Sequence, residues 1–296
     1  MIVVIGGANL DIKARSSAAA VGRTSNPGVV RTTPGGVGRN VAENLARLGS
    51  PVSLVSAVGT DAAGDDVLEE TEAAGVDVSR VKRGGPGGLA TGRYVAVLDA
   101  DGELVTAVAD MAATGSLTPG DVDAVADLVG TAALVVLDGN LAAATLGRAL
   151  DLCAGLGIRA VLDPVSVPKA RLLAEELRPT RPLFAITPNA DELEALGGVE
   201  TLHAAGAELV WVRVGAEGSR LSRPDGVVEV PRVRAPAVVD VTGAGDAALA
   251  AFCHALLGGA EPTRAAAYGQ AAAALTVAST HTVRPDLTDA LVRSLL

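Results

Sequence analysis

The regular alternation of strand-like and helix-like segments constrains the fold of this chain more than any other feature of its sequence. From residue 119 onward, short apolar runs closed by polar residues or glycine alternate with longer runs that have helical spacing. Helices are predicted over 119–129, 141–155 and 169–177, and strands over 133–137, 158–162 and 183–187. Short β-branched runs are typical of strands buried on both faces. Strands that alternate with helices form parallel sheets, so the sequence predicts an α/β fold with a doubly wound, mostly parallel sheet.

The first third of the chain follows the same alternation but contains two segments that have the pattern of exposed β structure. Residues 12–33 lack a helical period and include the turn sequence Ser25-Asn-Pro-Gly28, and residues 88–109 have the pattern of a β-hairpin. We expect these segments to pair in a small separate sheet that serves as a lid. The predicted organisation is one α/β domain over residues 1–296 with this lid inserted in it.

The composition excludes several classes of partner. The 296 residues carry a formal net charge of −10, so no basic stripe is available for a nucleic-acid backbone. Cys153 and Cys253 lie in apolar runs without metal-ligand spacing, which predicts free buried thiols. No stretch has the uninterrupted apolar length of a membrane span, and the first residues carry no basic leader. We therefore expect a cytoplasmic protein that binds neither nucleic acid nor membrane.

A seven-residue stretch, DVTGAGD, ends at Asp246 and combines features that phosphoryl transfer needs. Gly243 and Gly245 let the backbone turn its amide groups toward a ligand, and the apolar run over 247–257 predicts a helix directly after them. The N-terminus of that helix favours anions, and Asp246 in its first turn could take a proton from an attacking hydroxyl. The alternative is structural, with Thr242 as the N-cap and Asp246 as an acid that stabilises the helix.

Polar side chains follow several of the other predicted strands. Asn9 and Asp11 come after the first strand, where they would either hold neighbouring hydroxyls of a sugar or close the strand in an Asx turn. Asn189 and Glu192 follow a later strand, and their spacing suits a capping box as well as a metal site. Arg213 lies in the next predicted strand, over 208–214, as a phosphate contact or as a salt-bridged strand residue.

Taken in order along the chain, these motifs indicate a family resemblance that no single motif indicates. The matching stretches are Gly7-Ala-Asn9-Leu-Asp11, Gly35-Gly-Val-Gly38-Arg-Asn40, Asn189-Ala-Asp-Glu192, Val214-Gly-Ala-Glu-Gly218 and Asp240 to Asp246. Along essentially its whole length, the chain resembles the ribokinase-like sugar kinases of the PfkB family. Within that family it looks most like the pseudouridine kinases, in the stretches 25–28, 33–40, 110–111 and 163–166.

The resemblance implies transfer of the γ-phosphoryl group of ATP to the 5′-hydroxyl of pseudouridine. Asp246 would be the catalytic base, and the amides of Gly243, Ala244 and Gly245 would stabilise charge on the phosphoryl oxygens. The implied ribose-binding residues are Asn9, Asp11, Gly35, Gly36 and Asn40. The implied nucleotide-binding residues are Asn189, Arg213, Gly215, Gly218, Thr242, Gly243 and Gly245.

The resemblance also implies metal ions and an assembly. Asn189 and Glu192 would organise Mg²⁺ through water, and Asp240 and Thr242 match part of the family's monovalent-cation site, with a K⁺ requirement left open. Hypotheses for the contacts to the nucleobase rest on lid and strand-end positions, namely Ser25, Asn26, Asp110 and Lys169. A homodimer through the lid is expected, because it would protect the exposed edges of the lid strands.

Other functions are less well supported by the sequence. The nearest alternative is a kinase for another nucleoside or sugar, such as adenosine or ribose, although Arg39 stands where ribokinases usually have a small residue. A nicotinamide oxidoreductase is disfavoured because the G-x-G-x-x-G fingerprint and its downstream acid are missing. A catalytically silent nucleoside-binding regulator is disfavoured because Asp246 is retained.

Overall fold

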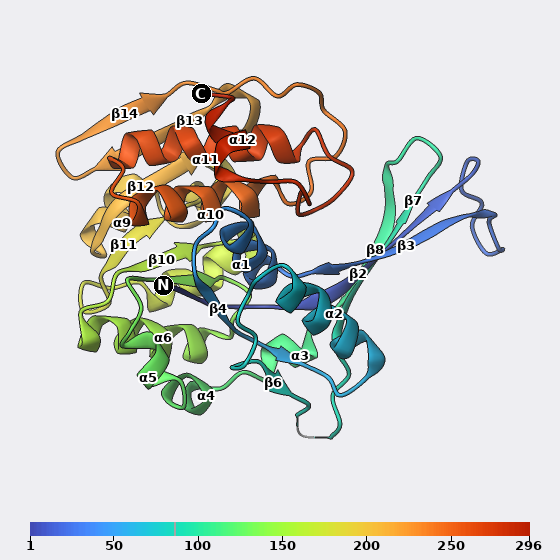
Figure 1. Ribbon diagram of the computed structural model, residues 1–296, viewed down its shortest axis with the longest axis horizontal. Helices are drawn as coiled ribbons and strands as arrows, with labels where there is room; N and C mark the ends of the chain where they lie inside the picture. Colours follow the sequence, from blue (N-terminus) through green and yellow to red (C-terminus); the bar gives the residue numbers. More distant parts are fainter. Residues whose placement is uncertain (86) are drawn as a thin grey trace.

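The structure, a computed structural model, describes residues 1–85 and 87–296. Pro86, in the glycine-rich stretch before the predicted hairpin, lies outside the described residues. The main body is an eight-stranded sheet with helices on both faces (Figure 1). Its strands are, in spatial order, β14 (Gly226–Val230), β13 (Ser219–Arg223), β12 (Ala207–Arg213), β11 (Leu183–Ile186), β10 (Ala160–Asp163), β9 (Leu134–Asp138), β1 (Ile2–Ile5) and β4 (Val52–Val55).

This sheet is mostly parallel and buried on both faces. The six strands from β4 to β12 run parallel, and the β13–β14 hairpin continues the sheet in antiparallel fashion. In β1, Ile2 and Val4 pack into the core on one face, whereas Val3 and Ile5 pack into the core on the other. This double burial explains the uninterrupted β-branched run at the start of the chain. The predicted fold class is confirmed.

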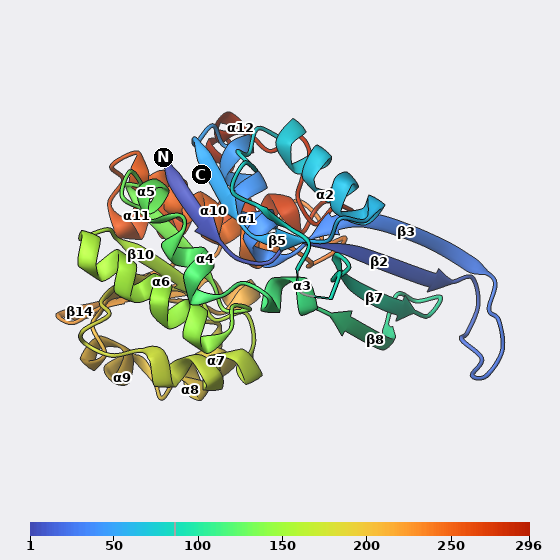
Figure 2. The same ribbon diagram turned by 90° about the horizontal axis from the view of Figure 1, so that it is seen from below.

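Helices form a layer on each face of the sheet (Figure 2). The helices on the face that contacts Ile2 are α1 (Val37–Arg47), α2 (Ala62–Ala73), α10 (Ala244–Leu257) and α11 (Pro262–Thr276), with α12 (Asp289–Arg293) packed against α11. The helices on the other face are α4 (Pro119–Asp123), α5 (Ala126–Val129), α6 (Ala143–Leu156), α7 (Val167–Leu173), α8 (Ala190–Ala195) and α9 (Val199–Ala204).

A smaller four-stranded sheet, which we call the lid sheet, projects from one end of the body (Figures 1 and 2). Its strands are, in spatial order, β3 (Gly28–Gly35), β2 (Asn9–Ser16), β7 (Gly92–Leu98) and β8 (Leu104–Asp110). β2 pairs with β7 in parallel, so the two predicted β segments join in one sheet. The short helix α3 (Ala112–Gly115) follows β8 and leads back to the body.

One apolar run and two of the predicted helices are divided in the structure. The apolar run over 52–58 separates at Ser56 into β4, which pairs with β1, and β5 (Ala57–Val58), which pairs with β6 (Lys82–Arg83). The predicted helix over 119–129 forms two short helices, α4 and α5. The predicted helix over 169–177 begins earlier, as α7, and ends in the 3₁₀ turn η1 (Ala174–Glu176). A second 3₁₀ turn, η2 (Gly215–Glu217), connects β12 and β13.

Candidate active site

Two cavities meet at the carboxyl ends of the parallel strands, where open α/β sheets bind their ligands. The lid cavity, of about 340 Å³, is lined by Gly7, Asn9, Asp11, Gly36, Val37, Asn40, Tyr94, Met111, Thr114, Asn140, Val165, Thr242, Asp246 and Thr282. The turn cavity, of about 350 Å³, lies beside η2 and is lined by Val37, Asp163, Val165, Asn189, Glu192, Trp211, Arg213, Gly215, Gly218, Ser219, Ala244, Gly245, Asp246, Ala248, Gln270 and Ala273. Val37, Val165 and Asp246 line both cavities and form their common wall. A hollow of about 540 Å³ at the amino ends of β11 and β12 shares no residue with either.

Asp246 stands in the common wall because it lies in the first turn of α10. Its Oδ2 accepts a hydrogen bond of 2.8 Å from Nδ2 of Asn40, which lies in the first turn of α1. The N-terminal turns of two helices therefore meet at the cavities, and helix N-termini favour negative charge. The predicted position of Asp246 in a helix that follows a glycine-rich turn is confirmed.

The turn before α10 requires glycine at position 243. Gly243 is the N-cap and has a φ of 79°, and a Cβ atom on it would lie 2.0 Å from the carbonyl oxygen of Thr282. Thr242 does not cap the helix, because its backbone N and its Oγ1 both donate to Asp240 Oδ1, at 2.9 and 2.6 Å. The predicted alternative that Thr242 is the N-cap is therefore wrong, whereas Asp246 is an acid in the first turn of α10, as both alternatives require. Ala244 and Gly245 line the turn cavity.

The surroundings of Asp246 raise its pKa to about 7. Burial is the largest cause, and the negative charges of Asp163 and Asp138 act in the same direction. The hydrogen bond from Asn40 and the positive charge of Arg213 oppose the increase in pKa. A carboxylate whose pKa lies near neutrality is suited to accept a proton in general base catalysis.

Four of the five predicted sugar-binding residues line the lid cavity, namely Asn9, Asp11, Gly36 and Asn40. Asn9 and Asp11, predicted in a loop, are the first and third residues of β2, so their side chains extend from the same face of the strand. Asn9 Nδ2 donates to Asp11 Oδ1 at 2.6 Å, and both residues line the cavity with Asn40. Burial raises the pKa of Asp11, against the hydrogen bond from Asn9 and the charge of Lys13. These residues present several hydrogen-bonding groups to one small volume.

Two glycines allow the backbone to approach these side chains. Gly36, with a φ of 95°, passes so near to Gly7 that a Cβ atom would lie 2.5 Å from the Gly7 carbonyl oxygen. Gly35 lies beside the carboxylate of Asp11, where a Cβ atom would lie within 2.4 Å. Gly36 lines the lid cavity, whereas Gly35 supports Asp11 from behind.

Asp138 supports the floor of the lid cavity and is fully buried at the end of β9. Its Oδ2 accepts hydrogen bonds from the backbone N of Gly7 at 2.8 Å and of Gly38 at 3.1 Å. Its Oδ1 accepts from the backbone and the side chain of Asn140, at 2.8 and 2.9 Å. One carboxylate thus ties the end of β1 to the start of α1, while burial raises the pKa of Asp138.

Asn189 and Glu192 form the capping box that their spacing predicts. Glu192 Oε2 accepts from the backbone N of Asn189, and Asn189 Oδ1 accepts from the backbone N of Glu192, each at 2.9 Å. Both residues also line the turn cavity. Burial raises the pKa of the buried Glu192 carboxyl group, and the neighbouring charge of Asp163 adds to this. The capping role therefore places an amide oxygen and a carboxylate at the cavity wall.

Arg213 is predicted either to contact phosphate or to be a salt-bridged strand residue. The structure contains a salt bridge. Its Nη2 lies 3.0 Å from Asp163 Oδ2, and its Nη1 donates to the carbonyl oxygen of Gly245 at 3.2 Å. Arg213 also lines the turn cavity, together with Gly215 and Gly218. The ion pair thus connects the ends of β10 and β12 to the first turn of α10.

Lys13, in the lid sheet, contacts the loop before α10. Its Nζ lies 3.0 Å from Asp240 Oδ2 and 3.3 Å from Thr242 Oγ1. Lys13 is on the same face of β2 as Asn9 and Asp11, because side chains alternate along a strand. The spacing of Asn9, Asp11 and Lys13 in the sequence indicates that the three side chains share one face of a strand. Lys13 lies outside the matched motif, which ends at Asp11, so the motif alone does not identify it.

The four residues named as hypothetical contacts to the nucleobase do not line either cavity, and these hypotheses stay untested predictions. Ser25 and Asn26 lie in the outer loop between β2 and β3, where the Asn26 side chain holds the loop through the backbone N and O of Val21, at 2.8 and 2.9 Å. Asp110 ends β8, and its Oδ1 accepts from the backbone N of Ala112. Lys169 lies in α7. The polar side chains of Asn26 and Asp110 thus have local roles, in holding the outer loop and in the turn after β8.

The cavities include residues that the sequence did not single out. Tyr94 from β7 and Thr114 from α3 join the lid cavity from the hairpin side, and Gln270 from α11 joins the turn cavity. They lie outside glycine-rich or strand-end motifs, so a motif search does not find them. Val165 has a φ of 69°, which is rare for a β-branched residue and marks local strain.

Two observations bear on metals and membranes. Among residues 1–85 and 87–296, no group of three or more His, Cys, Asp or Glu side chains is arranged to hold a metal ion. No helix in the described part of the chain is long and apolar enough to cross a membrane.

Comparisons with known proteins agree with this geometry. Residues 1–289 match the pfkB family of carbohydrate kinases. A pseudouridine kinase of Escherichia coli strain K12 is 30% identical over 307 residues, which cover 100% of this chain and 96% of the relative. An uncharacterized sugar kinase of the same strain is 33% identical over 297 residues, which cover 96% of this chain and 80% of the relative.

A solved structure gives the fold a name. The structure of a ribokinase from Arabidopsis thaliana, complexed with ribose and ATP, matches with a TM-score of 0.84 at 24% identity. The match covers 99% of this chain and 97% of that chain, so the fold is ribokinase-like with a smaller second sheet. The family match over residues 1–289 and the order of the site residues lead to one conclusion: this chain belongs to the pfkB family of carbohydrate kinases.

Proposed function

We propose that this protein is a pseudouridine kinase, which transfers the γ-phosphoryl group of ATP to the 5′-hydroxyl of pseudouridine. Its family membership makes it an ATP-dependent kinase of a sugar or nucleoside. The observation that carries the proposal is that Asp246 lines both cavities, because an acid in a common wall can reach an acceptor on one side and a phosphoryl group on the other. The similarity over the whole chain to a pseudouridine kinase supports this acceptor.

In the proposed mechanism the lid cavity holds the ribose part of the acceptor. Asn9, Asp11 and Asn40 bind its hydroxyl groups, and Asp246 accepts the proton of the 5′-hydroxyl as its oxygen attacks. The oxygen forms a bond to the γ-phosphorus, and the bond to the β-phosphate oxygen breaks to release ADP. The proton remains on Asp246 until it passes to solvent.

The turn cavity holds the nucleotide in this mechanism. The backbone amides of Gly243, Ala244 and Gly245 lie at the N-terminus of α10 and would stabilise negative charge on the transferring phosphoryl group. The Ala244 amide would exchange its 3.3 Å bond to the Val241 carbonyl oxygen for this contact. Gly215 and Gly218 leave room for the nucleotide beside η2. The Arg213–Asp163 pair fixes the Gly245 carbonyl oxygen, and so holds the turn in place.

The donor set of the turn cavity fits Mg²⁺. Glu192 keeps one carboxylate oxygen outside its capping bond, so it is the direct oxygen ligand that this wall offers. Asn189 Oδ1 already accepts a capping bond and Asp163 pairs with Arg213, so these two side chains would act through water. Oxygen ligands that act partly through water are those that Mg²⁺ prefers. When bound with ATP, Mg²⁺ would neutralise charge on the phosphate oxygens.

The side chains of Asp240 and Thr242 do not fit a K⁺ ion. Asp240 Oδ1 already accepts two hydrogen bonds from Thr242, and Asp240 Oδ2 accepts from the Lys13 ammonium group. The positive charge beside Asp240 is therefore that of Lys13 in the lid sheet.

A homodimer through the lid sheet is part of the proposal. The apolar side chains of Val29 and Val30 in β3 and of Leu104 and Val108 in β8 are 57–67% exposed, and these two strands are the edges of the sheet. Pairing of two copies would cover this apolar surface and the strand edges. Light scattering coupled to size-exclusion chromatography should give twice the chain mass, and the double variant Val30→Lys/Val108→Lys should give a monomer.

The substrate test is ADP release with a panel of acceptors. Pseudouridine should have the highest kcat/KM, and the matched control is uridine, which carries the same sugar and base joined through nitrogen instead of carbon. Phosphorus NMR of the product should show a 5′-phosphate. Equal or better turnover of adenosine, ribose or uridine would overturn the choice of acceptor, whereas no turnover of any acceptor would favour a silent regulator.

A further inference from the structure

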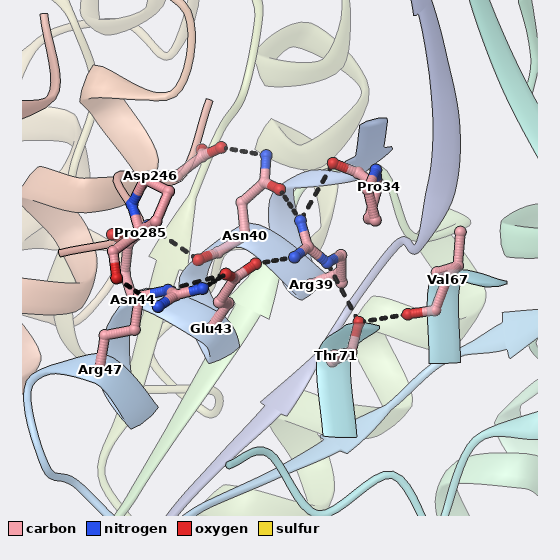
Figure 3. A network of polar contacts seen from close by, with 10 residues as sticks. All are labelled: Pro34, Arg39, Asn40, Glu43, Asn44, Arg47, Val67, Thr71, Asp246 and Pro285. Atoms are coloured by element: carbon pink, nitrogen blue, oxygen red, sulfur yellow. Dashed lines mark hydrogen bonds and ion pairs between the residues drawn. The ribbon is translucent and has the colours of Figure 1, made fainter. Parts of the chain in front are cut away.

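We infer that Arg39 is a positioning residue that fixes the side-chain amide of Asn40, and through it the carboxylate of Asp246. This inference rests on the proposed role of Asp246 and extends it to a residue that lines neither cavity. The three residues form a continuous chain of hydrogen bonds from α1 to α10, drawn in Figure 3.

Arg39 is buried, with 3% of its surface exposed, and its guanidinium group is held on every side. Nη1 donates to the carbonyl oxygen of Pro34 at 3.0 Å, Nε donates to Thr71 Oγ1 at 3.1 Å, and Nη2 pairs with the Glu43 carboxylate. These partners come from β3, α2 and α1, and Figure 3 shows them around one planar group. The fixed fork of an arginine allows little movement once all these bonds are made.

The contact with Asn40 decides which way its amide points. Arg39 Nη1 donates to Asn40 Oδ1 at 2.9 Å, and Asn40 Nδ2 donates to Asp246 Oδ2 at 2.8 Å. In the opposite orientation, an NH₂ group would face the guanidinium donors and a carbonyl oxygen would face the carboxylate. Both contacts would then be repulsive, because arginine has no acceptor and an ionised carboxylate has no donor. Arg39 and Asp246 therefore select the same orientation from opposite sides.

This orientation matters for the chemistry of Asp246. The Asn40 hydrogen bond lowers the pKa of Asp246, against the larger effect of burial. Without a fixed amide, the carboxylate would be held less firmly and would ionise at higher pH. The charged groups that face this chain of contacts are Glu43 and Arg47 in α1, Glu70 in α2, Asp11 in β2, and Asp138, Asp163 and Arg213 around Asp246.

The experiment removes Arg39 without leaving a buried carboxylate unpaired. The double variant Arg39→Met/Glu43→Gln keeps the side-chain volume and neutralises both ends of the pair. We expect its kcat to fall about tenfold and the acid limb of its kcat/KM profile to move up by about half a pH unit, the size of effect of one lost charge-assisted hydrogen bond. The matched control is Arg47→Met, because Arg47 also binds Glu43, at 2.6 Å, but is not bonded to Asn40, and Glu43 keeps its pair with Arg39 in this variant. The control should keep the wild-type acid limb.

A second comparison separates positioning from a structural role. In an Asn40→Ala background, removal of Arg39 should cause no further loss of kcat and no further shift of the acid limb, although the melting temperature should still fall. A full additional loss of kcat in that background, or an unchanged acid limb in the Asn40 background, would overturn the inference. If the double variant does not fold, Arg39→Lys enters the same comparison, because it keeps the pair with Glu43.

The acceptor used is whichever of the panel gives the highest kcat/KM. The comparison therefore remains valid if another nucleoside or sugar replaces pseudouridine as the substrate, and the two proposals can fail separately.

Discussion

Asn40 Nδ2 donates a 2.8 Å hydrogen bond to Asp246 Oδ2, and this bond joins the first turns of two helices that lie 206 residues apart in the sequence. Each residue follows a glycine-rich turn, and each belongs to a different part of the proposed site. The bond therefore couples the sugar-binding side of the lid cavity to the acid in the common wall.

The variant Asp246→Asn should lose about 10²–10⁴-fold in kcat, because it keeps the shape of the side chain but cannot accept a proton. Acceptor binding, measured by calorimetry, should change little. The matched control is Asp65→Asn, since Asp65 is also an acid in the first turn of a helix, α2, but is exposed. Near-normal turnover by Asp246→Asn would reduce Asp246 to a helix-stabilising acid.

The pH dependence of kcat/KM should follow the ionisation of Asp246. Since burial raises its pKa to about 7, kcat/KM should fall with unit slope as the pH decreases below that value. A profile that stays flat down to pH 5 would contradict the proposed base.

The same pKa makes a prediction for stability. The folded protein retains a proton on Asp246 at pH values where the unfolded chain, with a pKa near 3.8, has lost it. The stability that this proton contributes is present below pH 3.8 and is lost as the pH rises through 7. Asp246→Asn, which cannot ionise, should therefore melt at a higher temperature than the wild type at pH 8. This difference, measured by calorimetry, should vanish near pH 4.

We predict that Lys13 takes the place of a K⁺ ion beside Asp240. Exchange of NaCl for KCl should leave the wild-type kcat within about twofold, because the ammonium group already neutralises Asp240. Lys13→Ala should lower kcat/KM about threefold to fivefold, the effect of a partly exposed ion pair, and KCl should then restore activity. Lys13→Arg should behave like the wild type. Strong activation of the wild type by K⁺ would show that a cation binds elsewhere.

The strain at Val165 can be measured with two small residues. At most positions glycine is less stable than alanine, but at a φ of 69° the order should reverse, because glycine has no Cβ atom to strain. The free energy of unfolding, measured with urea, should therefore be about 1 kcal/mol higher for Val165→Gly than for Val165→Ala. Alanine as the more stable variant would mean that this backbone conformation does not persist in solution.

The single tryptophan reports on the turn cavity. Trp211 is fully buried, stacks on Phe252 with ring centroids 4.7 Å apart, and donates to Ser219 Oγ at 2.7 Å. Because Trp211 and Ser219 line the turn cavity, ATP should change the tryptophan emission, whereas the acceptor alone should change it far less. A response to the acceptor only would exchange the roles of the two cavities.

The sequence was sufficient for the fold class and for the residues that stand in motifs. β-branched runs buried on both faces and glycines at left-handed positions leave clear patterns, so β1, Gly243 and the first turn of α10 could be predicted. The nucleobase contacts could not be predicted, because a polar side chain such as Asn26 serves a turn as well as a ligand. Tyr94 reaches the lid cavity through the pairing of β2 with β7, which is a long-range contact without a local pattern, and Thr114 reaches it from α3.

One strand of the lid sheet also determines how this site can change. β2 carries Asn9, Asp11 and Lys13 on one face, and these residues reach the lid cavity and the loop before α10. An insertion of one residue ahead of Asn9 would turn Leu10 and Ile12 toward the cavity and remove all three polar groups together. Specificity for a new acceptor substrate should therefore arise by substitution of residues on this face of β2 rather than by insertion or deletion within the strand. Insertions and deletions should be tolerated in the outer loop between β2 and β3.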